Sequence, residues 1–157
     1  MGIEIERKFL LKNDNWKQDV STSAVIKQGY LAGSDKSSVR IRIEGDKANI
    51  NIKSMTLAIT RQEYEYSIPL DDAEKLLQDL CEQPQINKTR YIVKYKEHKW
   101  EIDVFSGDNE GLVVAEIELK SEDEAFSIPE WIGEEVSEQV KYYNVNLIKY
   151  PFSSWSS

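Results

Sequence analysis

Charged and apolar side chains alternate along the first ten residues of the chain. Glu4, Glu6 and Lys8 occupy every second position, and the positions between them are mostly apolar. Because successive side chains of a strand point to opposite faces, this segment predicts a β-strand with one charged face. Similar charge pairs return in 39–43, 61–66, 88–91, 101–104 and 115–119. Six such strands, some all-acidic and some all-basic, predict a sheet curled around a charged interior.

Most of these strands carry a single sign of charge. Within these strands Glu-x-Glu occurs three times, and Arg-x-Arg or Lys-x-Arg occurs twice. Like charges two residues apart lie about 7 Å from each other, which costs on the order of 2 kcal/mol per pair at an effective dielectric of about 20. Divalent cations would offset the repulsion between acids, and a multiply charged anion would offset that between bases. The pattern therefore predicts a metal-bound polyphosphate inside the sheet.

Eight strands joined mostly by short turns are expected, which favours antiparallel pairing. We predict them near 2–12, 24–32, 38–45, 48–54, 61–69, 86–96, 99–106 and 112–120. Helices are predicted at 71–80, after Ser121, where Glu124 completes a capping box, and over 140–149. The apolar positions of the strands would form an outer face on which the helices pack: Ile41, Ile43, Ile50, Ile52, Tyr64, Tyr66, Ile102, Val104, Ile117 and Leu119.

The length of 157 residues fits one domain spanning 1–157, with 153–157 as a flexible tail. The formal net charge of −8 argues against a nucleic-acid partner held by a general basic field. A single cysteine, Cys81, excludes an intramolecular disulfide, and no apolar run of about 18 residues indicates a membrane span. We expect a soluble cytoplasmic protein, as a monomer or homodimer, with no membrane or nucleic-acid partner.

A series of short motifs runs through the chain: Glu4-x-Glu6-x-Lys8, Gln28-Gly29-Tyr30-Leu31, Arg40-x-Arg42, Lys53, Arg61-x-Glu63-x-Glu65, Lys88-x-Arg90-Tyr91, Glu101-x-Asp103-x-Phe105, Glu116-x-Glu118 and Gly133-x-Glu135-Val136. In this order they resemble the CYTH superfamily, the triphosphate tunnel metalloenzymes. The short bacterial members that hydrolyse inorganic triphosphate are the most similar. The chain departs from the family pattern at Gln139, where the family has an acid ahead of a segment like Lys141-Tyr142-Tyr143-Asn144.

The resemblance implies an α+β fold, an eight-stranded antiparallel β-barrel with a charged lumen and helices packed outside. It implies that Glu4, Glu6, Glu116 and Glu118 bind one or two Mg²⁺ or Mn²⁺ ions. Substrate phosphates would be bound by Lys8, Arg40, Arg42, Lys53, Lys88 and Arg90, with the hydroxyl of Tyr30 nearby. Glu63, Glu65 and Asp103 would hold the basic residues in place or complete the metal shell.

The implied activity is metal-dependent hydrolysis of inorganic triphosphate to pyrophosphate and phosphate, with nucleoside triphosphates as further substrates. Lys8 is the predicted catalytic residue, either as a base whose pKa is depressed by neighbouring cations or as a phosphate-binding cation. Three alternatives stay open at this point. They are a class IV adenylyl cyclase, a thiamine triphosphatase and a polyphosphate-binding module without turnover.

Overall fold

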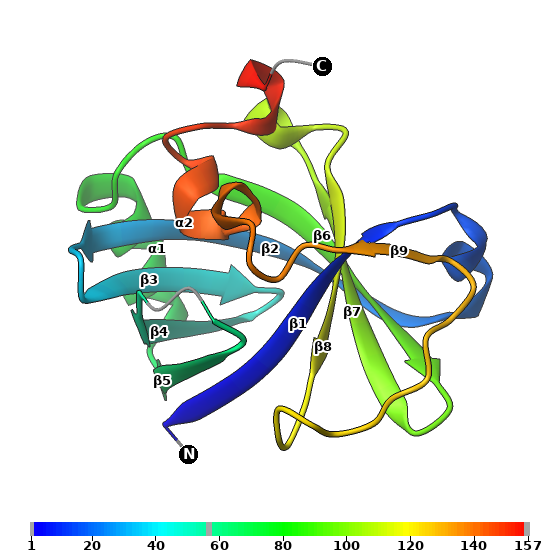
Figure 1. The fold of residues 1–157 in the computed structure, drawn as a ribbon. Helices are drawn as coiled ribbons and strands as arrows, with labels where there is room; N and C mark the ends of the chain where they lie inside the picture. Colours follow the sequence, from blue (N-terminus) through cyan, green and yellow to red (C-terminus); the bar gives the residue numbers. More distant parts are fainter. Residues whose placement is uncertain (1, 56–57, 156–157) are drawn as a thin grey trace.

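The computed structural model describes residues 2–55 and 58–155, and Figure 1 shows how their elements are arranged. The helices are α1 (Leu70–Asp79) and α2 (Asn144–Leu147), and 3-10 turns lie at Asn15–Asp19, Gly107–Asn109, Val140–Tyr142 and Phe152–Ser154. The strands are β1 (Ile3–Leu11), β2 (Val20–Gly33), β3 (Ser37–Glu44), β4 (Lys47–Ser54), β5 (Thr60–Ser67), β6 (Ile86–Tyr95), β7 (His98–Phe105), β8 (Val113–Glu118) and β9 (Ile132–Glu135).

The sheet closes into a barrel. Antiparallel pairs join the strands in the order β5-β4-β3-β2-β6-β7-β8-β1, and pairing of β1 with β5 through residues 3–5 completes the ring. This confirms the predicted eight-stranded barrel. The largest displacement of a boundary is at β2, which begins at Val20 rather than near residue 24. A ninth strand, β9, which the sequence did not predict, pairs with the far end of β1.

The outer wall is covered in two places. On one side, α1 packs Ala73 and Leu77 against Ile41 of β3. Gly29 of β2 permits this approach, because a Cβ there would lie 3.0 Å from both Leu77 and Cys81. On the other side, the segments around residues 16 and 126–131 cover the wall formed by β1, β6, β7 and β8 with a largely aromatic cluster, which includes Phe9, Trp16, Trp100, Ile102, Ile117, Leu119 and Trp131.

A third cluster, here called the apolar cap, lies where the inner faces of β1, β6, β7 and β8 change from charged to apolar residues. The change is from Lys88 to Ile86 on β6 and from Glu116 to Val114 on β8. Leu147 of α2 is fully buried in it. The buried members of the apolar cap are Tyr30, Ile86, Phe105, Leu112, Val114, Val136, Tyr142, Leu147 and Ile148. The C-terminal segment therefore covers one end of the barrel interior.

Two helix predictions need correction. No helix follows Ser121, because the carboxylate of Glu124 accepts the N–H of Lys120, outside the predicted cap, and 124–129 has no helical turn. The helix expected over 140–149 is divided into a 3-10 turn and the short α2. Tyr143 separates them because its backbone is extended, with φ −73° and ψ 134°.

The outer face of β4 and β5 is also less covered than expected. Ile52, Tyr64 and Tyr66 are 37%, 42% and 59% exposed, because α1 packs further along the barrel wall. At the C-terminus, the ring of Trp155 lies edge-on to those of Tyr142 and Phe152. The remainder of the predicted tail, 156–157, lies outside the described residues.

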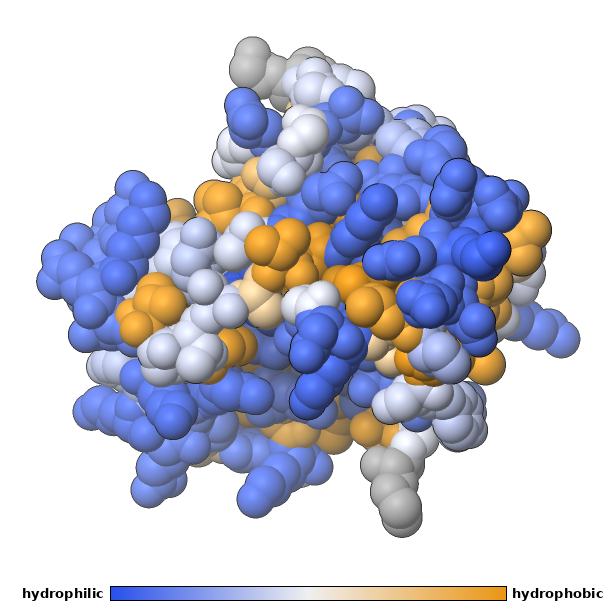
Figure 2. Space-filling view, turned by 180° about the vertical axis from the view of Figure 1, so that it is seen from behind, coloured by the Kyte–Doolittle hydropathy of each residue, from blue (hydrophilic) through white to orange (hydrophobic). Residues whose placement is uncertain are grey.

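The surface away from the interior is mixed in character. Figure 2 shows the molecule from behind, where hydrophilic residues cover most of the face and apolar residues emerge between them. Within 2–55 and 58–155, no helix combines the length and the apolar character needed to span a membrane.

Candidate functional site

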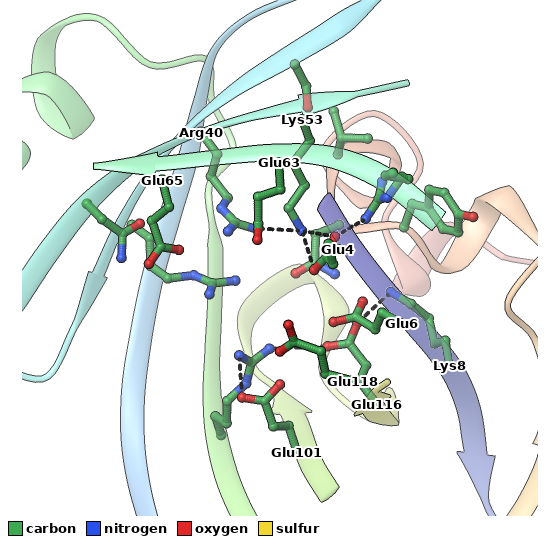
Figure 3. A pocket seen from close by; sticks show the side chains of 18 of the residues that line it. Glu4, Glu6, Lys8, Arg40, Lys53, Glu63, Glu65, Glu101, Glu116 and Glu118 are labelled. Carbon is green, nitrogen blue, oxygen red and sulfur yellow. Dashed lines mark hydrogen bonds and ion pairs between the residues drawn. The ribbon is translucent and has the colours of Figure 1, made fainter. Parts of the chain in front are cut away.

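One cavity lies inside the barrel and receives side chains from β1 to β8 and from the start of α2. Its volume is about 230 Å³. Figure 3 shows charged side chains pointing into it from facing strands. The lining consists of Glu4, Glu6, Lys8, Tyr30, Ser38, Arg40, Arg42, Glu44, Asn49, Lys53, Arg61, Glu63, Glu65, Lys88, Arg90, Glu101, Glu116, Glu118, Tyr143, Asn144 and Val145. These residues, together with Asp103, which contacts Lys88 and Arg90, are called the charged belt.

The structure brings the predicted site residues together. The four glutamates predicted to bind metal, the six predicted cations, and Tyr30 all line the cavity, as do Glu63 and Glu65. Asp103 does not line it. Its carboxylate lies inside the barrel against two lining residues, with Oδ2 2.8 Å from Lys88 Nζ and Oδ1 2.8 Å from Arg90 Nε. Asp103 therefore holds two of the predicted phosphate-binding cations in place.

Glu4, Glu6, Glu116 and Glu118 gather on one side of the cavity (Figure 3). Strand register explains this grouping, because Glu6 lies opposite Glu118 and Lys8 lies opposite Glu116 across β1 and β8. Burial, with the charges of Glu116 and Glu4, raises the pKa of Glu6 well above its ordinary value. Burial also acts to raise the pKa of Glu116. The charge of Lys8, a hydrogen bond from Glu6 and the charge of Arg90 outweigh burial and hold that pKa well below its ordinary value. The pKa values of these two hydrogen-bonded carboxyl groups are thus moved in opposite directions.

Carboxylates also pair with cations around the belt. Lys53 Nζ lies 3.1 Å from Glu4 and 3.4 Å from Glu63, and Arg61 lies 3.6 Å from Glu4. Burial acts to raise the pKa of Glu4, but the charges of Lys53 and Arg61 outweigh it and lower the pKa. Glu63 and Glu65 are joined through the side-chain amide of Asn51. These contacts fix the acids and bases of facing strands relative to one another.

Arg40 and Arg42 differ from the other cations of the belt. Both are buried, at 6% and 9% exposure, and within the described residues neither forms an ion pair with a carboxylate. Nε of Arg40 is buried without a hydrogen-bond partner among those residues. Burial and the charges of Arg40 and Arg90 lower the pKa of Arg42 to about 10. Because a buried cation without a counter-charge is costly, these two guanidinium groups are suited to bind an anion.

The predicted depression of the Lys8 pKa is wrong. Burial acts to lower it, but Glu116, 3.3 Å away, and Glu6 outweigh burial and raise the pKa above its ordinary value. The lysine with a strongly lowered pKa is Lys88. Burial lowers its pKa to about 7 despite the opposing charge of Asp103. In this arrangement the two acidic neighbours of Lys8 favour its cationic form.

Several lining residues were not among the predicted site residues. Arg61 belongs to the motif Arg61-x-Glu63-x-Glu65. Its alternation with Glu63 places both side chains on one face of the strand and could have identified it as a lining residue. Tyr143, Asn144 and Val145 lie outside the strand pattern, so alternation could not reveal them. The other additions are Ser38, Glu44, Asn49 and Glu101. Lys141 lies elsewhere, 4.7 Å from the centre of the Trp155 ring.

The acidic side of the belt offers suitable donors for a hard divalent cation. Its donors are carboxylate oxygens, which Mg²⁺ and Mn²⁺ prefer. Glu6 and Glu116 interact through a hydrogen bond, which a cation between the two carboxyl groups would replace. In the arrangement described, 2–55 and 58–155 contain no group of three acidic, histidine or cysteine side chains close enough to form a complete metal site. Glu4 would have to exchange Lys53 for a metal ion.

Comparisons with known proteins give consistent results. The family model of the CYTH domain matches residues 2–149. The chain is 43% identical over 155 residues to the inorganic triphosphatase of Acetivibrio thermocellus, covering 99% of each chain. It is 38% identical over 149 residues to the inorganic triphosphatase of Nitrosomonas europaea, covering 92% of this chain and 95% of the other. The crystal structure of the inorganic triphosphatase NE1496 superposes with a TM-score of 0.66 at 36% identity, covering 92% of this chain and 93% of that one.

Proposed function

The chain belongs to the CYTH domain family, and we propose that it hydrolyses inorganic triphosphate to pyrophosphate and phosphate with the help of divalent metal ions. Two relatives that share about two fifths of its residues are inorganic triphosphatases. The observation that carries the proposal is the pair Arg40 and Arg42, two buried guanidinium groups that face the cavity without a carboxylate partner among the described residues. A chain of phosphoryl groups has the negative charge and the oxygens that such a pair binds.

The charge of the lining supports the need for metal ions. Seven cations, Lys8, Arg40, Arg42, Lys53, Arg61, Lys88 and Arg90, face eight glutamates in the cavity. A nearly neutral lining would bind a multiply charged anion weakly, so additional positive charge is required. We propose that Glu4, Glu6, Glu116 and Glu118 hold one or two Mg²⁺ or Mn²⁺ ions. Bound there, the metal would neutralise charge on phosphoryl oxygens and lower the pKa of a water molecule.

The protein side chains have separate tasks in this scheme. Arg40, Arg42, Lys53, Lys88 and Arg90 bind phosphoryl oxygens and keep the chain of phosphates extended for in-line attack. Asp103 holds Lys88 and Arg90 through ion pairs, and Glu63 holds Lys53 in the same way. Glu65 supports Glu63 through the shared amide of Asn51. Tyr30 lines the same cavity.

Lys8 lines the cavity and pairs with Glu116, and in this scheme it acts as a cation that stabilises the developing negative charge. We expect Lys8→Arg, which keeps the charge but cannot accept a proton, to retain at least a tenth of the turnover that Lys8→Ala loses. Equal loss in both variants would argue for the lysine amine itself.

Inorganic triphosphate fits the lining better than a nucleoside triphosphate. Most residues that line the cavity carry a charge, an amide or a hydroxymethyl group. Among the described lining residues the exceptions are Tyr30, Tyr143 and Val145, and the two tyrosine rings do not contact each other. A nucleobase would gain little from such a surface. The cyclase and thiamine triphosphatase alternatives need a pocket for the organic group, so the lining disfavours both.

The test is an assay of the purified protein with Mg²⁺ or Mn²⁺ and, in separate reactions, tripolyphosphate, ATP, thiamine triphosphate and pyrophosphate. We expect rapid release of phosphate from tripolyphosphate and at least a thousandfold loss in Glu4→Gln. Cyclic AMP with pyrophosphate from ATP would instead identify a cyclase. Binding of tripolyphosphate without phosphate release would identify a binding module.

A further inference from the structure

The side-chain carbonyl of Asn144, the first residue of α2, connects two walls of the barrel. Its Oδ1 accepts hydrogen bonds from Lys88 Nζ at 2.8 Å and from Gln28 Nε2 at 2.9 Å. Gln28 Oε1 in turn accepts a hydrogen bond from Arg42 Nε at 3.0 Å. A continuous chain of hydrogen bonds thus joins Lys88 on β6 to Arg42 on β3 through β2 and α2.

This chain lies in a buried place. Gln28 has no exposed surface, and Lys88 is 2% exposed. Both polar atoms of the Gln28 side chain are satisfied, one by Arg42 and one by Asn144. A buried amide that loses a partner is costly, so Gln28, Asn144 and Arg42 have little freedom to adopt another arrangement.

The hydrogen bonds leave the phosphate-binding atoms available. Arg42 is held through Nε, and its two terminal nitrogens have no hydrogen-bond partner within the described residues. Lys88 donates to Asn144 and Asp103, which leaves one of its three N–H groups for a ligand. Both residues line the cavity.

The acceptors supplied by Asn144 and Gln28 are neutral. A carboxylate that fixed Arg42 would also cancel its charge, as Glu4 does for Lys53. An amide oxygen orients Arg42 and leaves its charge for the anion, whereas Lys88 is also paired with Asp103. The pair Asn144 and Gln28 therefore suits a position beside a phosphate site better than a second pair of acids would.

We propose that Asn144 and Gln28 are positioning residues that hold Lys88 and Arg42 in the geometry that binds triphosphate. This inference rests on the proposed function and deepens it. It also gives α2 a role beyond covering the apolar cap, since the C-terminal segment then completes the phosphate-binding wall.

The first experiment compares Asn144→Ala with Asn146→Ala, a matched control on the same helix. Asn146 does not line the cavity, and its side chain donates to the carbonyl of Val140. With tripolyphosphate, we expect Asn144→Ala to lower kcat/KM at least tenfold, and Asn146→Ala to change it less than twofold. Equal effects of the two substitutions would overturn the proposal.

A double-mutant cycle with Lys88→Ala separates positioning from a general structural role. If Asn144 acts through Lys88, adding Asn144→Ala to Lys88→Ala should lower kcat/KM less than a further threefold. Losses that multiply would overturn the proposal, as would an effect of Asn144→Ala on melting temperature alone. If Asn144→Ala does not fold, the same cycle can be made with Gln28→Met and Arg42→Ala. Gln28→Met keeps the side-chain volume but removes both hydrogen bonds of Gln28.

Failure of the proposed function is distinguished by measuring binding separately. If the unaltered protein releases no phosphate, calorimetric titration with tripolyphosphate and Mg²⁺ still compares affinities. We then expect Asn144→Ala to weaken binding at least tenfold relative to Asn146→Ala. Equal affinities would overturn the positioning role whatever the outcome for turnover.

Discussion

The charged belt and the apolar cap are built from the same strands, yet they do different work. Side chains of β1, β6, β7 and β8 point into the barrel in both regions, but the inner residues change along each strand. The sequence of inner residues is Glu4, Glu6, Lys8 and Leu10 on β1, Arg90, Lys88 and Ile86 on β6, Glu101, Asp103 and Phe105 on β7, and Glu118, Glu116 and Val114 on β8.

The two regions contribute differently to stability. Buried ion pairs are a weak source of stability, because removing two charges from water costs about as much as their attraction returns. Burial of apolar side chains is a strong source, at about 25 cal/mol per Å². The apolar cap and the outer clusters therefore hold the barrel in shape, so that the charged belt can keep unpaired cations such as Arg40. Stability and ligand binding are separated along one interior.

Chelation of divalent metal is expected to have the largest effect and to act on the belt alone. With EDTA, phosphate release from tripolyphosphate should fall more than about a thousandfold, because the nearly neutral lining loses the positive charge that offsets the anion. The barrel should remain folded, since ion pairs hold the glutamates in the absence of metal. Phosphate assays with and without added Mg²⁺, and far-ultraviolet circular dichroism in EDTA, measure the two effects. Unfolding in EDTA would mean that metal, rather than the apolar cap, maintains the barrel.

Arg40→Ala should separate activity from stability. We expect kcat/KM to fall about 10²- to 10³-fold, the usual loss on removing one preorganised group that stabilises developing charge. The free energy of unfolding should stay the same or rise, because the substitution removes a buried cation without an ion-pair partner among the described residues. Steady-state kinetics and urea unfolding test both parts.

Arg7→Ala is the matched control for Arg40→Ala. Arg7 lies on the outer face of β1 and pairs with Glu135 at 3.1 Å. We expect its substitution to change kcat/KM less than twofold. If Arg40→Ala destabilised the protein while leaving kcat/KM unchanged, the guanidinium pair would be a structural feature and not an anion site.

Leu112→Ala should show the reverse behaviour. Leu112 belongs to the apolar cap, is 3% exposed and does not line the cavity. Its truncation should lower the free energy of unfolding by about 3 kcal/mol while changing kcat less than twofold at 25 °C. Leu80→Ala, at a leucine that is 64% exposed, should cost less than about 0.5 kcal/mol. A large loss of kcat in the folded Leu112→Ala protein would show that the cap and the belt are coupled.

The barrel could be predicted from the sequence because strand alternation is a local signal. Glu4, Glu6 and Lys8 were assigned to one face from their spacing alone, and the register with Glu116 and Glu118 then brings them together. The apolar cap was not predicted. The change from charged to apolar residues along an inner face is visible in the sequence only once the direction in which each strand faces is known.

The C-terminal contribution to the cavity could not be predicted from local pattern. Tyr143 interrupts the expected helix with an extended backbone, and this turns Asn144 toward Lys88. Such a contact depends on where two segments 56 residues apart meet in space. The pKa of Lys8 was missed for a similar reason. Its neighbours in the sequence gave no measure of how close Glu116 would lie.

Acid titration gives the smallest expected effect and compares the regions by their response to pH. Burial acts to raise the pKa of Asp103, but the charges of Arg90 and Lys88 outweigh it and lower the pKa to about 2. The unfolded chain should titrate this group near 3.9, so its contribution to stability, roughly 2 kcal/mol, is complete above that pH and is lost as the pH falls through about 2. Urea unfolding of the unaltered protein and of Asp103→Asn at pH 5, 3 and 2 should show a difference that shrinks by that amount. The cost of Leu112→Ala should be the same at each pH, because no titratable group is removed. A difference for Asp103→Asn that stays constant down to pH 2 would mean that Asp103 is not held ionised by Lys88 and Arg90.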